Sequence, residues 1–322
     1  MRRGAGLEGA ADVAAVIRRD EIDWSAYERA TEASVKVRNA AEFTQELDVE
    51  FADRHHARKA VMFSTKLGEC IEFRPGETTC WAGFNGHRKS LMTSQVALDL
   101  CFQGERTLIA SMEMSPGKTL ARMARQMFGM ARPDTDMRRR FMGWSDGRLW
   151  LFDHLGRVSP TQMLAVCRYF ADELKGMHVF IDSMMMVCAS EEHLDEQKQF
   201  VTDCVRAAQE SGLHIHIVAH CRKPANGTED KPPTKYDLRG SAAISDQSSN
   251  VITVWSNKPK KAKLDNDPND AGALDQPDAL VTVEKQRNGE YEGRLKLWWD
   301  ERSLRFMNDR TSPVEPYRID IE

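Results

Sequence analysis

A lysine–serine pair follows a glycine-containing loop between residues 78 and 90, directly after an apolar segment. The spacing from Gly83 to Lys89 and Ser90 matches the phosphate-binding pattern G-x-x-x-x-G-K-[ST] at all positions but one. In that pattern, backbone N–H groups and a helix N-terminus bind phosphate oxygens, the lysine reaches the β- and γ-phosphates, and the hydroxyl binds Mg²⁺. The residues that we expect to contact a phosphate chain are Gly83, Asn85, Gly86, His87, Arg88, Lys89 and Ser90.

Arg88 is the departure from this pattern. It stands where the pattern has its second glycine, a position that favours a small residue close to the phosphates. Gly86 lies two residues earlier and does not replace that glycine at the same atom. The Arg88 side chain could block phosphate binding, point outward, or add a charge-assisted contact to phosphate. The sequence leaves these alternatives open.

Acidic residues follow three other apolar segments. Glu113 and Asp182 each come at the end of such a segment, and Asp153 has the same local form. A carboxylate at this point can hold Mg²⁺, mostly through water. We expect Asp182 rather than Asp153 to do so, because Asp182 stands further along the chain and shortly before a long helical segment. Ser90 and Asp182 are therefore the predicted metal ligands.

Short apolar runs alternate with helical segments from about residue 71 onward. The runs that we expect to form strands are Thr78–Ala82, Thr107–Ser111, Leu149–Phe152, His178–Ile181, His214–Ala219 and Val251–Trp255. The segments that we expect to form helices are Lys89–Cys101, Gly117–Met130, Pro160–Leu174 and Glu196–Ser211. This alternation predicts an α/β fold with a mainly parallel sheet flanked by helices. If consecutive strands are neighbours, the strand before Glu113 lies beside the strand before the phosphate-binding loop.

The C-terminal part has a different pattern. Leu280–Gln286 and Arg294–Trp299 flank the dipeptide Asn288-Gly289, which favours a hairpin turn, and Leu304–Phe306 follows. We therefore expect antiparallel hairpin strands after the parallel core.

Three further segments lie outside this alternation. Lys258–Asp278 contains a run of lysines, then several aspartates and few apolar residues, so we expect a solvated loop between two strands. Ala10–Arg19 and Trp24–Val37 carry apolar residues at helical spacing, which predicts an N-terminal helical arm. The arm could pack on the main domain or on a neighbouring subunit. The predicted division is an arm or linker at residues 1–55, a main domain at 56–310 with the inserted loop 258–278, and a C-terminal tail at 311–322.

Composition limits the class of protein. No run among the 322 residues approaches the roughly 18 apolar residues of a membrane helix, and the start of the chain has no secretory signal. The seven cysteines form no C-x-x-C pair, which argues against a zinc site and a disulfide framework. We therefore expect a protein of the reducing cytoplasm that does not contact membranes. The net charge of −4 gives no support to binding of nucleic acid over the whole surface.

The order of these segments resembles the RecA-type motor domain of DnaB-like ring helicases, with the phage helicase–primase and mitochondrial Twinkle branch as the nearest pattern. The resemblance covers about Ile71 to Trp299, and its specificity comes from seven segments in the right order. These segments are Arg74–Thr78, Gly83–Ser90, Ser111–Met114, Phe180–Asp182, His214–His220, Asp237–Ser241 and Glu284–Gly289. The resemblance implies a RecA-like P-loop NTPase core.

The resemblance also implies roles for single residues. Glu113 falls where the family has the carboxylate that polarises the attacking water, and His220 falls where it has a polar sensor of the γ-phosphate. Lys285 and Arg287 match the pair that reaches the neighbouring subunit's nucleotide, with Arg287 as an arginine finger. Because they lie at a hairpin turn, both side chains are expected to project outward.

A basic loop follows the strand that ends at His220. In the family, this loop lines a central channel and follows the phosphates of one DNA strand. The corresponding basic residues are Arg222, Lys223, Lys235 and Arg239. Contacts of this kind are directed to the backbone, depend on salt and tolerate any sequence. Since DNA inside a ring meets only such loops, the negative net charge does not exclude it.

The resemblance implies an NTP-dependent replicative DNA helicase that moves 5′→3′ on single-stranded DNA as a ring, with a hexamer as the expected homo-oligomer. It implies ATP or dTTP as substrate, Mg²⁺ as cofactor, a separate primase or loader as partner, and a bacterial or phage-infected host cytoplasm. Two alternatives remain. One is a RecA-like recombination or regulatory ATPase that does not unwind DNA. The other, motivated by Arg88, is a nucleotide-dependent scaffold with an impaired P-loop.

Overall fold

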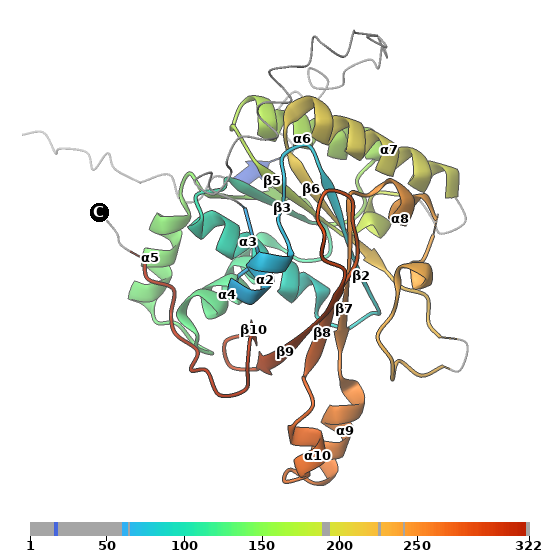
Figure 1. Ribbon diagram of the computed structural model, residues 1–322. Helices are drawn as coiled ribbons and strands as arrows, with labels where there is room; N and C mark the ends of the chain where they lie inside the picture. Colours follow the sequence, from blue (N-terminus) through green and yellow to red (C-terminus); the bar gives the residue numbers. More distant parts are fainter. Residues whose placement is uncertain are drawn as a thin grey trace, which may run out of the picture.

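Within the described residues, one ten-stranded sheet forms the centre of the protein (Figure 1). The computed structural model describes residues 16–18, 60–63, 65–188, 194–224, 227–240 and 242–319. The order of strands across the sheet is β1-β4-β3-β5-β6-β2-β7-β8-β9-β10. The parallel strands are β1 (Val16–Arg18), β2 (Thr78–Gly83), β3 (Thr107–Ser111), β4 (Leu149–Asp153), β5 (His178–Asp182), β6 (His214–His220) and β7 (Asn250–Ser256). The antiparallel strands are β8 (Ala279–Gln286), β9 (Gly293–Asp300) and β10 (Arg305–Met307).

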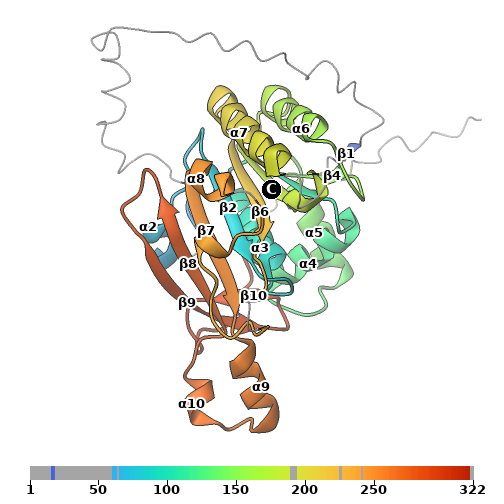
Figure 2. The same cartoon turned by 90° about the vertical axis from the view of Figure 1, so that its right-hand side faces the viewer.

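Helices cover both faces of this sheet (Figures 1 and 2). One face carries α2 (Thr65–Cys70), α3 (Lys89–Phe102), α4 (Pro116–Phe128) and α5 (Thr135–Ser145). The other face carries α6 (Pro160–Asp172), α7 (Leu194–Ser211) and α8 (Ala243–Gln247). The structure confirms the predicted fold class, a mainly parallel sheet between helices with antiparallel C-terminal strands.

The alternation of side chains along each strand explains the two helical layers. In β2, Cys80 and Ala82 pack among apolar residues of α6 and α7, whereas Trp81 packs with residues of α3 and α4. Successive side chains of a strand point to opposite faces, so a strand that is apolar throughout must be covered on both sides. All six residues of β2 are buried. The apolar runs in the sequence are therefore the central strands of the sheet.

Two predictions about the strands are wrong. β3 does not lie beside β2, because β5 and β6 lie between them. Parallel neighbours need a crossover connection, and these crossovers carry the chain past the adjacent position. Within Ala10–Arg19, which we expected to be helical, Val16–Arg18 form β1 and pair with β4. The other predicted arm helix, Trp24–Val37, lies outside the described residues.

The insertion between β7 and β8 is helical rather than an irregular loop. It forms α9 (Lys258–Asn266) and α10 (Ala271–Leu274), which project from the body of the protein (Figure 2). The side chain of Asn257 caps α9 by accepting a hydrogen bond from the Lys260 backbone N–H, and Asp270 caps α10 in the same way. Lys260 also pairs with Asp278 at 2.7 Å. We expected a loop because this segment has few apolar residues. The helices are stabilised instead by these local hydrogen bonds and by the ion pair.

The predicted antiparallel hairpin of β8 and β9 is confirmed, and Asn288-Gly289 lies within the connection between the two strands. β8 ends at Gln286 and β9 begins at Gly293. Asn288 is held in place, since its Nδ2 donates to the Glu77 carboxylate at 2.6 Å. This contact ties the connection to the start of β2.

The described part of the predicted C-terminal tail packs against the main domain. Tyr317 stacks on Phe102 of α3 with ring centroids 4.5 Å apart, and its backbone N–H donates to the Met127 carbonyl of α4. Ile319 is buried. No helix within the described residues is long and apolar enough to cross a membrane.

Candidate functional site

The phosphate-binding loop connects β2 to α3 at the carboxyl edge of the parallel strands. Gly83 ends β2, and a Cβ atom at this position would overlap the carbonyl oxygen of Val254 on β7. Gly86 and Arg88 both adopt left-handed backbone conformations, with φ of 73° and 63°. Backbone N–H groups in such loops can converge on an anion, and the N-terminus of α3 adds its dipole. The loop therefore has the geometry of a phosphate cradle.

Arg88 occupies the left-handed position that immediately precedes α3. A glycine adopts this conformation without strain, which explains the glycine in the common pattern. The Arg88 guanidinium lies 4.4 Å from the centre of the Trp299 ring, and it donates a hydrogen bond to Ser256 Oγ at 3.3 Å. These contacts direct its charge toward β7 and β9. Of the alternatives for Arg88, this geometry matches an outward-pointing side chain.

Lys89 is almost fully buried at the first position of α3. Its ammonium donates hydrogen bonds of 2.9 Å to the carbonyls of Gly83 and Phe84, and one of 3.1 Å to Nδ1 of His220. Burial lowers the pKa of Lys89, and the nearby groups Cys221, Asp182 and Glu113 oppose this shift. Because Nδ1 of His220 accepts from the ammonium, the proton of a neutral His220 lies on Nε2.

Two carboxylates complete this edge of the sheet. Burial raises the pKa of Asp182 at the end of β5; a hydrogen bond from Ser90 opposes that shift and the charge of Glu113 adds to it. Glu113 follows β3 and accepts a hydrogen bond of 3.0 Å from Ser183 Oγ. Asp153, the competing candidate, is exposed at the end of β4, three strands away from β6. The structure therefore brings Asp182, and not Asp153, to the loop.

These groups surround one cleft of about 610 Å³. Besides residues 85–91 of the loop and helix start, the cleft is lined by Glu113, Arg122, Asp182, Met185, His220 and Arg239. A cleft of this size suits a small-molecule ligand. Arg122 on α4 and Met185 were not foreseen, because nothing in the local sequence separates them from other exposed or apolar helical residues.

The donor set fits Mg²⁺. Ser90 and Asp182 present a hydroxyl and a carboxylate, which are oxygen ligands of the kind that Mg²⁺ prefers. Both residues line the same cleft. Mg²⁺ keeps several waters and takes only one or two protein ligands when it also binds phosphate. Within the described residues, no group of three or more His, Cys, Asp or Glu side chains could hold a metal by itself. The residues present thus suit a metal that arrives with a nucleotide.

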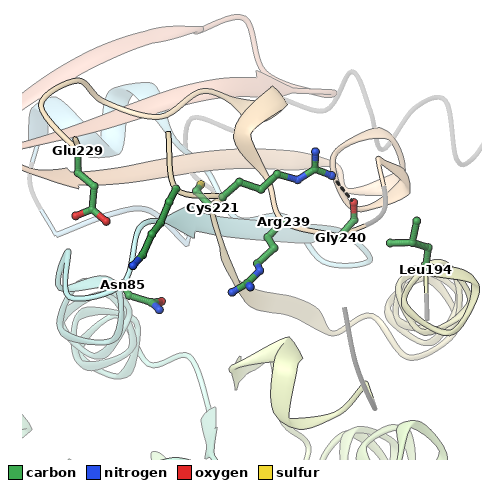
Figure 3. Close-up of a pocket in the computed structure, with 8 residues that line it drawn as sticks. Asn85, Leu194, Cys221, Glu229, Arg239 and Gly240 are labelled. Atoms are coloured by element: carbon green, nitrogen blue, oxygen red, sulfur yellow. Dashed lines mark hydrogen bonds between the residues drawn. The ribbon is translucent and has the colours of Figure 1, made fainter. Parts of the chain in front are cut away.

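A second cavity, of about 520 Å³, adjoins the first and shares Asn85 and Arg239 with it (Figure 3). Arg222 and Lys223 also line it. The structure therefore brings together three of the four residues predicted to contact DNA. The fourth, Lys235, lies apart from them, because its backbone N–H and its ammonium both bond to Glu284 of β8.

The loop that carries these cations is closed at its base. Cys221 and Leu238 form a β-bridge, and the backbone N–H of Arg222 donates to the Asp237 carbonyl at 2.8 Å. The Arg222 guanidinium also contacts the Gly240 carbonyl, drawn as a dashed line in Figure 3. The loop therefore begins and ends directly beside His220 and the phosphate-binding loop.

Lys285 and Arg287 lie at the opposite edge of the parallel strands. Gln286 pairs with Asn250 at the start of β7, and the backbone N–H of Arg287 donates to the Ser249 carbonyl. Lys285 does not project outward as expected: its ammonium donates to the carbonyls of residues 245, 246 and 248 at 2.8–2.9 Å. The last carbonyls of α8 lack helical partners and attract a cation. Arg287 remains exposed and touches the Asp246 carbonyl at 3.3 Å.

Two further residues near the cleft were missed. Ser183 orients Glu113, and Glu229 bonds to His87 of the phosphate-binding loop. Ser183 directly follows Asp182, so its place at the end of the same strand could have indicated that it lies near the site. Glu229 lies in an irregular loop 142 residues from His87, and no local pattern links the two.

Comparisons with known proteins agree with this geometry. A solved structure described as an ATPase domain has a TM-score of 0.68 and 16% identity, covering 87% of this chain and 100% of that chain. Another, described as "The Structure Of A DnaB-Like Replicative Helicase And Its Interactions With Primase", has a TM-score of 0.67 and 16% identity, covering 87% and 69%. At this identity they show a shared fold. The family model of the DnaB-like helicase C-terminal domain matches residues 65–308, so the chain belongs to the DnaB-like helicases.

Proposed function

We propose that this protein is an NTP-dependent replicative DNA helicase that hydrolyses nucleotide between subunits of a ring. The observation that carries the proposal is the convergence of Lys89, Asp182, Glu113 and His220 on one cleft at the end of the parallel strands. In this proposal, the four side chains supply a phosphate ligand, a metal ligand, a base and a sensor, in that order.

Each side chain has a defined task in this proposal. Lys89 exchanges its contacts with its own loop for the β- and γ-phosphates of ATP or dTTP. Ser90 and Asp182 would hold Mg²⁺, which would neutralise charge at the phosphates when bound. Glu113, oriented by Ser183, orients the attacking water. His220 donates a hydrogen bond from Nε2 to the γ-phosphate. When the γ-phosphate leaves, this bond is lost, and the basic loop that follows His220 can shift.

The position of Arg287 supports a site shared between subunits. Arg287 lies level with the start of β2, whereas Gly83 ends that strand, so the two are separated by about a strand length, roughly 17 Å. Within one chain, Arg287 does not line the cleft. In a head-to-tail ring, the edge that carries Arg287 can face the cleft of the next subunit. Lys285 would then be released from α8 when the ring forms.

The basic loop supplies the contact with single-stranded DNA in this proposal. Arg222, Lys223 and Arg239 surround the cavity next to the nucleotide cleft, which suits binding of phosphates without regard to sequence. We infer movement in the 5′→3′ direction, a hexameric ring, a separate primase or loader, and a place in the cytoplasm, as for the family. A primase partner is supported by the interactions described for one of the similar structures.

Steady-state hydrolysis of ATP and dTTP with Mg²⁺, with and without oligo(dT), tests the proposal. We expect hydrolysis that rises when oligo(dT) is added, together with strand displacement on a forked duplex. Hydrolysis without strand displacement would favour the recombination or regulatory ATPase. Nucleotide binding without hydrolysis would favour the scaffold.

A further inference from the structure

The imidazole of His87 joins the phosphate-binding loop to its surroundings. This side chain has no exposed surface. Its Nδ1 accepts a hydrogen bond of 3.0 Å from the Ser256 backbone N–H, so Nε2 carries the proton and donates to the Glu229 carboxylate at 2.8 Å. Burial lowers the pKa of His87, which keeps the ring neutral with one donor and one acceptor. Both nitrogens are therefore used to fix the loop.

Glu229 reaches His87 from the basic loop between Cys221 and Leu238. Its carboxylate also contacts the Lys258 ammonium at the start of α9, and its backbone carbonyl accepts a hydrogen bond of 2.9 Å from Trp255 Nε1. Burial alone would raise the pKa of Glu229, but the hydrogen bonds from Lys258 and His87 lower it below the ordinary value. The carboxylate is therefore an anionic acceptor, which strengthens the bond to the imidazole.

The same loop carries the cations that face the second cavity. Arg222, Lys223 and Glu229 all line it, together with Asn85 of the phosphate-binding loop (Figure 3). A DNA phosphate that binds Arg222 or Lys223 would pull these side chains toward it and would displace the loop that also carries Glu229. Because Glu229 is bonded to His87, and His87 precedes Arg88 and Lys89, such a displacement would move the backbone that surrounds the phosphates of the nucleotide.

We propose that Glu229 is a positioning residue that couples DNA binding at the basic loop to the phosphate-binding loop through its hydrogen bond with His87. The coupling rests on the proposed function, since it needs both ligands. It is reciprocal: DNA changes the affinity for nucleotide by the same factor by which nucleotide changes the affinity for DNA.

The test measures this factor directly. The dissociation constant of a non-hydrolysable ATP analogue is measured by titration with and without saturating oligo(dT), and the ratio of the two values is the coupling factor. We expect a ratio of at least about 5 for the wild-type protein and below about 2 for Glu229→Ala. Glu229→Gln keeps an acceptor for His87 and should retain most of the coupling.

A matched control separates this role from loss of charge or of stability. Asp230→Ala removes a neighbouring exposed carboxylate from the same loop and should leave the coupling factor unchanged. His87→Phe retains a buried ring but removes both bonds, so it should reduce coupling as Glu229→Ala does. The double variant should lose no more coupling than either single variant, because all three variants remove the same hydrogen bond between Glu229 and His87. Thermal unfolding midpoints, measured in parallel, check that each variant is folded.

The outcomes distinguish the two proposals. If the wild-type protein shows a DNA effect and Glu229→Ala shows the same effect, the coupling through Glu229 is overturned and the proposed function stands. Additive losses in the double variant would also overturn the route through His87. If oligo(dT) binds the wild-type protein but does not change its nucleotide affinity, the coupling is overturned and the proposed function stands on its hydrolysis and strand-displacement tests. If oligo(dT) does not bind the wild-type protein, the proposed function and the coupling are both overturned.

Discussion

Both edges of the parallel part of the sheet carry polar side chains that are buried or half-buried, but these side chains have different partners at the two edges. At the carboxyl edge, Lys89, Asp182 and His220 line a cleft of about 610 Å³. At the amino edge, His178, His214 and His216 lie at or near the starts of β5 and β6 and are buried.

The amino-edge imidazoles bond to protein groups. His216 accepts a hydrogen bond of 3.1 Å from Trp81 Nε1 and lies 3.2 Å from Nδ1 of His178. His214 bonds to Thr79 Oγ1 at 2.8 Å and to the Arg74 carbonyl at 2.7 Å. These bonds hold the strands together, and none of the three histidines lines the two cavities described above. Burial of polar groups alone therefore does not mark a functional site, whereas polar groups that surround a cleft do mark one.

The largest expected effect is at the carboxyl edge. Lys89→Ala removes the cation that we expect to bind the phosphates, so hydrolysis of ATP should fall by at least about 10³-fold. The control, Lys118→Ala, removes an exposed lysine of α4 and should keep wild-type turnover. Steady-state hydrolysis measures both. If Lys89→Ala turned over ATP at close to the wild-type rate, the phosphate-binding loop would not be the site of hydrolysis.

Arg287→Ala tests whether the amino edge serves catalysis after all. An arginine finger contributes about 10³–10⁵ in rate, so we expect a loss of about 10³-fold in kcat. Because Arg287 lies far from its own cleft, nucleotide affinity should stay within about threefold, as measured with a fluorescent nucleotide. Arg139→Ala, an exposed arginine of α5, is the matched control. Wild-type kcat in Arg287→Ala would show that this residue is not a finger.

We expect the three buried histidines of the amino edge to make the free energy of unfolding depend on pH. Burial lowers the pKa of all three, to about 4 for His214. In the unfolded chain a histidine binds a proton below about pH 6.5, so the unfolded state binds more protons as the pH falls below that value. The free energy of unfolding should therefore decrease with falling pH, by on the order of 1 kcal/mol per pH unit for each histidine.

Urea unfolding between about pH 8 and pH 5 measures this slope. His214→Gln keeps an acceptor and a donor at this position and removes one titrating group. The unfolded state of the variant should therefore bind about one proton fewer, which makes the dependence of the unfolding free energy on pH less steep. An equal slope in the variant and the wild-type protein would show that His214 does not contribute.

The smallest effect is expected for Arg88→Gly, at the border of the cleft. Glycine relieves the left-handed backbone strain but loses the stacking on Trp299, and each is worth about 1 kcal/mol, so the two offset each other. Turnover should change less than about threefold, because the guanidinium contacts Ser256 and Trp299 and makes no hydrogen bond to the groups that we expect to act on the nucleotide. A large rise in turnover would show instead that Arg88 restrains the enzyme.

The fold could be predicted where the sequence carried a local reason for it. The apolar runs that became β2 to β7 are bounded by polar residues, and the helices between them have regular apolar spacing. The helices of the insertion could not be predicted in this way, because side-chain caps and the Lys260–Asp278 pair stabilise them rather than apolar burial. The order of β3, β5 and β6 depends on crossovers that no local pattern encodes.

For the candidate site, the sequence located the groups at strand ends and missed the contacts between loops. Lys89, Asp182 and His220 each follow a readable strand, so their convergence could be expected. The partners of Lys285 are backbone carbonyls of α8, and the partner of His87 is Glu229 from a distant loop. Backbone carbonyls leave no trace in residue types, and a single glutamate in a polar loop resembles any solvated acid.

The central claim is that the two edges meet across a subunit boundary. It can be tested by mixing Lys89→Ala and Arg287→Ala proteins, which are each expected to be inactive, and forming joint oligomers whose composition is verified by mass. At an equal mixture, about a quarter of the interfaces in a closed ring would combine an intact Lys89 with an intact Arg287. We expect the joint oligomers to hydrolyse ATP far faster than the sum of the two separate proteins. Joint oligomers that hydrolyse no faster than that sum would contradict it.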